Sequence, residues 1–406
     1  EQEVAEAGSA RGREDAGGVY LENERLSVRV RGDGRVDLED LQNGVAVEDV
    51  LVLTDGGDIG DLYNYSPPPE DLVVSSREAE VLGVELLAVG PVLSSARLEL
   101  ELPIPSALAD DRQRRSRERC GLAVVLTFTL SGAGTALEVD IDLDNTATDH
   151  RLRALVRQPH GVPVAAASVA QAAFTVEQRS AVPAPVPVEL WREDAPETHP
   201  QHGWCAVAGD DGGFAVLSRG LPEYQLTAEG SSSVLAVTLL RAVGRVHARD
   251  SLTIDRRAWG IPFRTPLAQC LGKQGFSLAV HPYGNTWAGA NIDHVAERFV
   301  YNYKALQMEP GQWASSESLV LYIDRDGIIM SALKPAESGD GVVVRLWNNR
   351  GEAQSANITL SRSVRRVSRC TMRENVSEEL AVLGAASGGS GGTGGSGRRS
   401  LTVPFG

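Results

Sequence analysis

The chain has 406 residues and carries 54 acidic against 39 basic side chains, so its formal net charge at pH 7 is −15. Hydrophobic residues make up 42% of it, which allows a sizeable core, and its length suits two or three domains at roughly 100–200 residues each. The acidic balance argues against binding to a phosphate backbone, which needs clustered Lys and Arg. No apolar run approaches the roughly 20 residues that span a bilayer. We therefore expect neither nucleic acid nor a membrane as a partner.

The cysteines and the first residues bear on the cellular compartment of the protein and on whether the chain is a piece of a longer one. Four scattered cysteines without a CxxC pair favour free thiols in a reducing compartment over a disulfide scaffold. No signal peptide is recognisable, so we expect a cytoplasmic protein. The chain begins with Glu1 rather than Met, and we interpret it as a piece of a longer protein. Residues 1–17 are charged and lack apolar periodicity, which predicts a flexible linker.

From Val19 onward, apolar and polar residues alternate in one segment after another, which predicts β-strands. The segment VYLENERLSVRVRGDGRVDLEDLQNG alternates around Gly32-Asp33-Gly34, the signature of a hairpin with a tight turn. Long helical periodicity is absent, and the best helical candidate is a short turn near Asn291–Tyr303. These patterns predict an all-β fold with a large antiparallel sandwich over residues 18–308.

A second block of strand patterns predicts a small C-terminal β-sandwich over residues 309–406. It contains the low-complexity stretch SGGSGGTGGSG at residues 387–397. Its composition predicts a flexible loop that buries no core. A strand pattern follows it, which favours a long loop inside the last hairpin, with an engineered linker as the alternative.

Motifs for catalysis are scarce. The closest histidine pair, His199 and His202, has no carboxylate at metal-ligand spacing, so a solvated loop is favoured over a zinc site. No GxSxG elbow, P-loop or GxGxxG motif opens a helix. The sequence therefore predicts no catalytic residue from local motifs.

The segment GDIGDLYNYSPP at residues 57–68 is the strongest candidate for a binding site. Its glycines and prolines fix an irregular backbone, on which Asp58, Asp61, Tyr63 and Asn64 offer polar contacts beside an aromatic surface, as sugar sites require. The alternative is a loop whose carboxylates cap its own backbone N–H groups.

Two weaker candidates follow further along the chain. Residues 144–153 cluster Asp, His and Arg at a strand end, where forked guanidinium donors could hold a substrate carboxylate. The alternative there is a structural pair between Asp149 and Arg151. The segment GLPEY at residues 220–224 carries Glu223, and its alternative is a hairpin turn with an exposed carboxylate.

At GDIGDLYNYSPP the chain resembles the C-terminal β region of glycoside hydrolase family 38, the α-mannosidase family, in its bacterial, mannosylglycerate-hydrolase-like branch. Further segments agree in the family's order, among them DNTATDHRLR, GLPEYQLT, LAVTLLRAVG, TPLAQCLG and FSLAVHPYG. The resemblance runs from about Val19 to the end of the chain. The Arg-rich segment RSVRRVSRC and the glycine-rich loop depart from the family pattern.

The resemblance implies a domain arrangement and a reaction. In the family, an N-terminal barrel and a helical domain carry an aspartate nucleophile and a zinc ion, and the reaction retains anomeric configuration. The C-terminal part is a galactose-mutarotase-like supersandwich followed by small β domains. This implies that the chain itself carries neither nucleophile nor zinc ligands and is inactive alone. It further implies partnership with its own N-terminal catalytic domain and an α-mannoside or mannosylated small molecule as substrate. Members often form homo-oligomers, a state that the sequence itself does not specify.

The resemblance also implies roles for individual residues. A tyrosine of the family's C-terminal sandwich reaches the sugar site, and Tyr63 stands at the matching position. Asp58, Asp61 and Asn64 would be further contacts or supports for it. Arginines of the sandwich approach the site in some members, which makes Arg151 and Arg153 candidates.

Two other classes of function stay open from the residues alone. A stand-alone aldose-epimerase-like enzyme would need His150 or His281 to converge with Glu223 as acid and base. A carbohydrate-binding module would stack sugar on Tyr63, Tyr65 and Trp204. Fold alone does not decide among the three functions.

Overall fold

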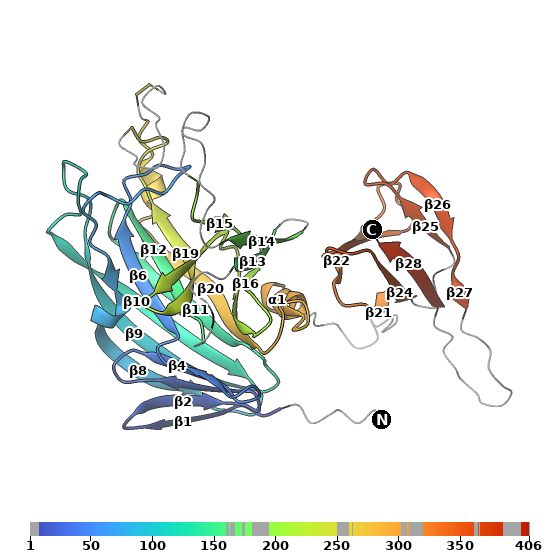
Figure 1. Ribbon diagram of the computed structural model, residues 1–406, viewed down its shortest axis with the longest axis horizontal. Helices are drawn as coiled ribbons and strands as arrows, with labels where there is room; N and C mark the ends of the chain where they lie inside the picture. Colours follow the sequence, from blue (N-terminus) through green and yellow to red (C-terminus); the bar gives the residue numbers. More distant parts are fainter. Residues whose placement is uncertain are drawn as a thin grey trace. The chain divides into compact units, whose positions relative to one another are not determined.

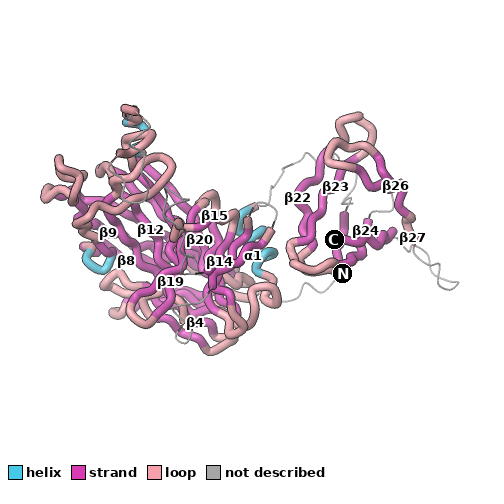
Figure 2. Tube along the Cα trace, turned by 45° about the horizontal axis from the view of Figure 1, so that its top comes forward, coloured by secondary structure: helices cyan, strands magenta, loops and turns pink. Residues whose placement is uncertain are grey.

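The computed structural model describes residues 8–159, 162, 167–172, 175–180, 195–249, 260–261, 263–301, 307, 320–360, 364, 366–384 and 399–405. The chain divides into two compact units, the larger formed by Glu1–Ala173 with Glu177–Tyr301 and the smaller by Phe174–Val176 with Asn302–Gly406. Nearly all regular structure is antiparallel strand (Figures 1 and 2). The prediction of an all-β sandwich fold is confirmed. The glycine-rich loop at 387–397 lies outside the described residues.

The larger unit begins with a five-stranded sheet. In spatial order its strands are β1 (Arg11–Asp15), β2 (Gly18–Glu22), β3 (Leu26–Val30), β4 (Val36–Asp40) and β5 (Val45–Val47). The hairpin predicted around Gly32-Asp33-Gly34 is confirmed, because β3 pairs with β4 and Gly34 takes a φ of 82°. The prediction of a flexible linker over residues 1–17 is wrong at β1, because the backbone of β1 pairs with β2. The side chains of β1 are mostly exposed, so its sequence shows no apolar alternation that would predict a strand.

A nine-stranded sheet forms the second layer. In spatial order it contains β14 (Val176–Ser180), β13 (Ala167–Gln171), β16 (Trp204–Ala208), β17 (Gly213–Ser218), β20 (Gly272–Tyr283), β11 (Leu137–Asn145), β10 (Arg119–Ser131), β9 (Leu93–Pro105) and β8 (Glu80–Ala88). In β10 every second residue from Leu122 to Leu130 is buried. This is the period of a strand with one face on a core.

A six-stranded sheet carries most of the candidate site residues. Its spatial order is β15 (His199–Pro200), β18 (Glu223–Glu229), β19 (Ser232–Ala242), β12 (His150–Arg157), β6 (Leu51–Gly57) and β7 (Val74–Ser75). One hydrophobic core joins the three sheets, with Leu38, Leu98 and Leu152 among its members. The long β-sheets therefore share a single interior.

Helical structure in the described part of the larger unit is limited to short segments. They are η1 (Ser76–Glu78), η3 (Pro266–Gln269) and α1 (Ile292–Val300). The helix α1 agrees with the turn predicted near Asn291–Tyr303. It buries Ile292, Ala296 and Phe299 at helical spacing and packs on β16 and β17. No helix in the described ranges is long and apolar enough to cross a membrane.

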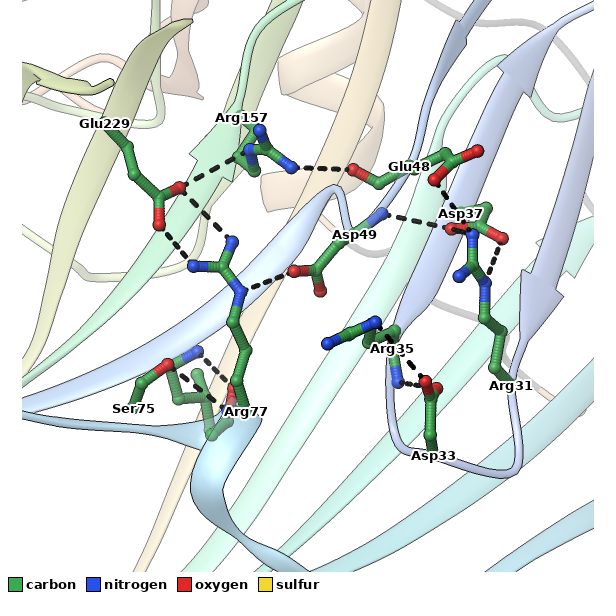
Figure 3. Close-up of polar contacts among 12 residues, drawn as sticks. Arg31, Asp33, Arg35, Asp37, Glu48, Asp49, Ser75, Arg77, Arg157 and Glu229 are labelled. Atoms are coloured by element: carbon green, nitrogen blue, oxygen red, sulfur yellow. Dashed lines mark hydrogen bonds and ion pairs between the residues drawn. The ribbon is translucent and has the colours of Figure 1, made fainter. Parts of the chain in front are cut away.

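A chain of charged groups ties the five-stranded sheet to the six-stranded sheet (Figure 3). Arg77 of η1 pairs with Asp49, at 2.5 Å between Nε and Oδ2, and with Glu229 at the end of β18. Arg157 of β12 lies 3.4 Å from the same Glu229 carboxylate and donates to the Glu48 carbonyl. Because these side chains are only partly exposed, the network fixes the two sheets against each other more firmly than isolated surface pairs would.

The described part of the smaller unit contains three small sheets. The four-stranded sheet has the order β21 (Val320–Ile323), β24 (Gln354–Leu360), β28 (Arg399–Phe405) and β27 (Leu383–Gly384), and two hairpins are β22 (Ile328–Pro335) with β23 (Val342–Asn348) and β25 (Val367–Cys370) with β26 (Val376–Leu380). Its buried residues include Ile328, Ala356, Ile358 and Leu401. The unit thus has a core of its own.

The helix α1 predicts a pH-dependent stability. Burial, and then the neighbouring Asp293, raises the pKa of Glu297 to about 7. The folded state therefore keeps a proton between about pH 4.5 and 7 that the unfolded state releases, so this group lowers the free energy of unfolding as pH rises. We compare the free energy of unfolding of the Glu297→Gln variant with that of wild type. Its advantage over wild type should be about 1 kcal/mol larger at about pH 8 than at about pH 4.5, after discounting for a side chain that is 34% exposed.

Urea unfolding at both pH values measures this difference. The exposed Glu80→Gln serves as control and should show no such gain. Equal responses from the two variants would contradict the assignment to Glu297.

Candidate functional site

The segment after β6 turns back on itself and forms a tight loop, here called the Tyr63 loop (residues 58–68). Its backbone closes through hydrogen bonds from Ile59 N to Ser66 O at 2.8 Å and from Asp61 N to Asn64 O at 3.0 Å. A Cβ atom added to Gly60 would lie 2.1 Å from Asn64 O. The loop therefore requires glycine at position 60, where backbone passes directly over backbone.

Asp58 anchors the Tyr63 loop to β19. Its side chain is fully buried and lies 2.8 Å from Nη2 and 2.9 Å from Nε of Arg241. Its other oxygen accepts hydrogen bonds from the N–H groups of Gly60 and Ser66. Burial raises the pKa of the Asp58 carboxyl, and the Arg241 guanidinium opposes this shift by stabilising the carboxylate. Arg241 also donates to the carbonyl oxygens of Asp61 and Asn64.

Asp61 holds the tip of the same loop. One of its oxygens accepts from the N–H groups of Tyr63 and Asn64, both at 2.9 Å, and the other accepts from Ala248 N at 2.9 Å. Asp58 and Asp61 are each 0% exposed, so neither can touch a ligand. The structure thus corrects their prediction as sugar contacts and supports the alternative, in which the carboxylates cap the backbone of the loop.

The aromatic residues of the loop differ in exposure. Tyr63 is 62% exposed at the tip, whereas Tyr65 is half-buried on the sheet. The Arg151 guanidinium stacks on the Tyr65 ring, with Cζ 3.3 Å from the ring centroid. Burial raises the pKa of Tyr65, which keeps its phenol protonated at neutral pH. The loop therefore presents one tyrosine outward and uses the other for packing.

Two arginines of β12 lie beside Tyr65. Arg151 is 5% exposed, and its Nη1 lies 3.9 Å from Glu223 Oε1, without a hydrogen bond to any described residue. Arg153 donates to Gln225 Oε1 at 2.9 Å. Burial, and then Arg151, lowers the pKa of Arg153 to about 10, so it remains charged at neutral pH. The structure thus brings Tyr65, Arg151 and Arg153 together.

Glu223 belongs to the same face of the six-stranded sheet. Its carboxylate accepts a hydrogen bond from Thr238 Oγ1 at 2.6 Å, and its side chain is only 28% exposed. The alternative of a hairpin turn with an exposed carboxylate is therefore wrong. Glu223 partly balances the positive charge of the two arginines.

His150 and Asp149 have structural roles. His150 is fully buried, with Nδ1 2.5 Å from Asp55 Oδ2 and Nε2 3.0 Å from Asn145 Oδ1, and Arg115 pairs with the same Asp55. Asp149 pairs with Arg112 at 3.5 Å rather than with Arg151. His150 thus has no access to a substrate.

The other residues proposed for an epimerase or for a carbohydrate-binding module are not placed for those functions. His281 lies on β20 in the nine-stranded sheet, whereas Glu223 begins β18 in the six-stranded sheet, so they do not form the acid–base pair of an epimerase. Trp204 is fully buried and packs on Trp287 at 5.6 Å between ring centroids. It cannot stack on a sugar.

Potential metal ligands do not cluster in the described ranges. No three His, Cys, Asp or Glu side chains there gather in a way that could hold a metal ion. His199 packs near Tyr224, at 5.9 Å between ring centroids, and burial lowers its pKa. The residues that the structure describes therefore do not fit a zinc ion.

Arg241 is the residue that the sequence interpretation missed. It stands in LAVTLLRAVG, where a charge inside an otherwise apolar strand is a signal for a buried ion pair. Its partner Asp58 is 183 positions away. The local pattern therefore shows that a partner is needed but does not say which.

The fold of the chain is shared with parts of two solved structures. Its TM-score is 0.72 with an alpha-mannosidase from Enterococcus faecalis V583, at 21% identity over 86% of this chain and 39% of that one. It has the same TM-score with a protein in glycosyl hydrolase family 38 from Enterococcus faecalis, at 18% identity over 97% of this chain and 44% of that one.

Sequence comparisons agree with the resemblance to glycoside hydrolase family 38. Residues 327–403 match the C-terminal beta sandwich domain of glycosyl hydrolases family 38. The chain is 26% identical over 380 residues to a putative mannosylglycerate hydrolase of Halalkalibacterium halodurans, covering 89% of this chain and 39% of the relative. The predicted resemblance to the C-terminal β region of glycoside hydrolase family 38 is confirmed. The chain spans about two fifths of the length of these relatives.

The Asp58–Arg241 pair predicts a large effect on stability. Asp58→Asn removes the charge that compensates a largely buried guanidinium, so the free energy of unfolding should fall by about 3 kcal/mol. The surface variant Asp33→Asn removes an exposed pair with Arg35 and should cost about 1 kcal/mol or less. Urea unfolding of both variants compares the two losses in the free energy of unfolding. Similar losses would show that the buried pair stabilises the fold no more than the exposed pair does.

Proposed function

We propose that the chain is the non-catalytic C-terminal β portion of a retaining, zinc-dependent α-mannosidase, and that it completes the sugar site of an N-terminal catalytic domain. The match to the family 38 sandwich domain and the named relatives support the family. The retaining mechanism and the zinc ion come from the resemblance. The described residues do not fit zinc, so we assign no step to a metal within this chain.

The observation that carries the proposal is the presentation of Tyr63. Its side chain is 62% exposed, whereas the backbone beneath it is held by two buried carboxylates and by Arg241. A phenol on a pre-organised loop can bind a sugar hydroxyl without the cost of ordering the loop. Asn64 lies next to it and is a second candidate for a direct contact.

The arginine pair beside Tyr65 bears on substrate choice. The Nη1 donor of Arg151, which has no hydrogen bond to any described residue, is buried, so Arg151 would act through its charge. Arg153 is half-buried and charged at neutral pH. Guanidinium groups pair with carboxylates through two parallel hydrogen bonds. A small anionic aglycone would match these groups, in agreement with the name of the putative mannosylglycerate hydrolase.

A Tyr63→Phe substitution tests the role of the phenol in the full-length enzyme. Each hydrogen bond lost from the transition state is worth about 1 kcal/mol, so kcat/KM should fall about fivefold for each bond. Tyr301→Phe is the matched control, because that tyrosine is 64% exposed in the same unit. An unchanged kcat/KM for Tyr63→Phe, or an equal fall for Tyr301→Phe, would contradict the assignment.

A second experiment tests whether zinc binding and activity depend on an N-terminal domain. Zinc content and hydrolysis of an aryl α-mannoside are measured for this chain and for a form extended at its N-terminus. We expect bound zinc and activity only in the extended form. Zinc-independent sugar conversion by the chain itself would favour an epimerase, and sugar binding without hydrolysis by either form would favour a binding module.

A further inference from the structure

A polar cavity of about 400 Å³ lies in the larger unit, apart from the Tyr63 loop. It forms where the turn after β4, the turn between β10 and β11, and the residues after β20 meet. Its volume falls within the range of small-molecule sites, roughly 300–1,000 Å³. The lining includes Arg25, Gln42, Asn43, Thr135, His281 and Asn285.

His281 offers this cavity a hydrogen-bond acceptor. The side chain is 3% exposed, and Nδ1 lies 2.7 Å from the carbonyl oxygen of Thr135. A carbonyl oxygen only accepts, so Nδ1 carries the proton. Burial lowers the pKa of His281 to about 4, which leaves the ring neutral and Nε2 with a lone pair. Within the described ranges no group donates to Nε2, so this nitrogen is left to accept a hydrogen bond from a ligand.

The rim of the cavity adds neutral amides. Asn43 Nδ2 donates to Asp40, which leaves Oδ1 as a second acceptor. The side-chain amides of Gln42 and Asn285 are exposed and make no hydrogen bond to the residues described, so each offers both donors and an acceptor. The cavity therefore presents donors and acceptors of the kind that hydroxyl groups satisfy.

The charges around the cavity select against ions. Arg25 is the one cationic side chain in its lining, and it lies 3.9 Å from the buried carboxylate of Asp40 and donates to the Pro282 carbonyl at 3.1 Å. Among the described residues that line the cavity there is no Asp or Glu for a cation. An uncharged ligand thus leaves the balance between Arg25 and Asp40 undisturbed.

We propose that this cavity is a second carbohydrate site, which binds one neutral sugar or polyol through a hydroxyl that donates to His281 Nε2 and through further hydroxyls paired with Gln42, Asn43 and Asn285. The site is independent of the Tyr63 loop and of the hydrolytic activity proposed above. It would hold a sugar without cleaving it, since no carboxylate lines it.

Titration of the whole chain with D-mannose tests this site, with saturation-transfer NMR for binding and the ¹⁵N resonance of His281 Nε2 for the contact. We expect binding with a shift of that resonance. The double variant Gln42→Ala/Asn285→Ala should bind at least threefold more weakly, because both side chains are removed from the rim without breaking a described hydrogen bond. Tyr322→Ala, at a 62% exposed tyrosine of the smaller unit, should leave the affinity unchanged, and D-glucuronate should bind more weakly than D-mannose.

Three results would overturn the proposal. They are an absence of D-mannose binding at high millimolar concentration, an affinity unaffected by the double variant, and an equal loss of affinity in Tyr322→Ala. The last result would show that the loss is not specific to the cavity. None of them decides whether the extended protein hydrolyses a mannoside, so the two proposals fail separately.

Discussion

The buried ion pair between Asp58 and Arg241 determines how the rest of the candidate site is arranged. Removing a carboxylate from water is costly unless hydrogen bonds replace its hydration. Here Asp58 receives two guanidinium contacts and two backbone N–H groups, and the same guanidinium binds two carbonyl oxygens of the loop. The path of the loop, and with it the positions of Tyr63 and Tyr65, follows from this one pair.

The strands and the unusual loop could be predicted because their signals are local. Alternation marks strands such as β10, and the glycines, prolines and aspartates at 57–68 mark an irregular backbone. The edge strand β1 was missed because its side chains are mostly exposed and only backbone pairing holds it. Long-range pairing has no local signal, because Asp58 and Arg241 are 183 positions apart, which is why their ion pair was not predicted.

His150 and His281 also show that residue type alone does not predict the role of a side chain. His150 and His281 are alike in sequence terms, since both follow or lie in strands. The structure surrounds His150 with Asp55 and Asn145 and thereby removes it from any binding role. His281 bonds through only one nitrogen and lines a cavity. The surroundings of each ring, rather than the residue type, decide what it can do.

The Tyr63 loop also separates buried side chains that hold its main chain from side chains that are exposed. Its main chain is held by Asp58, Asp61 and Arg241, whereas the side chains of Leu62 and Tyr63 point outward and are 46% and 62% exposed. Substitutions at positions 62 and 63 therefore cost little stability, since surface changes away from such anchors usually have small effects. The main chain of the loop should therefore keep its path when either of these two side chains is replaced.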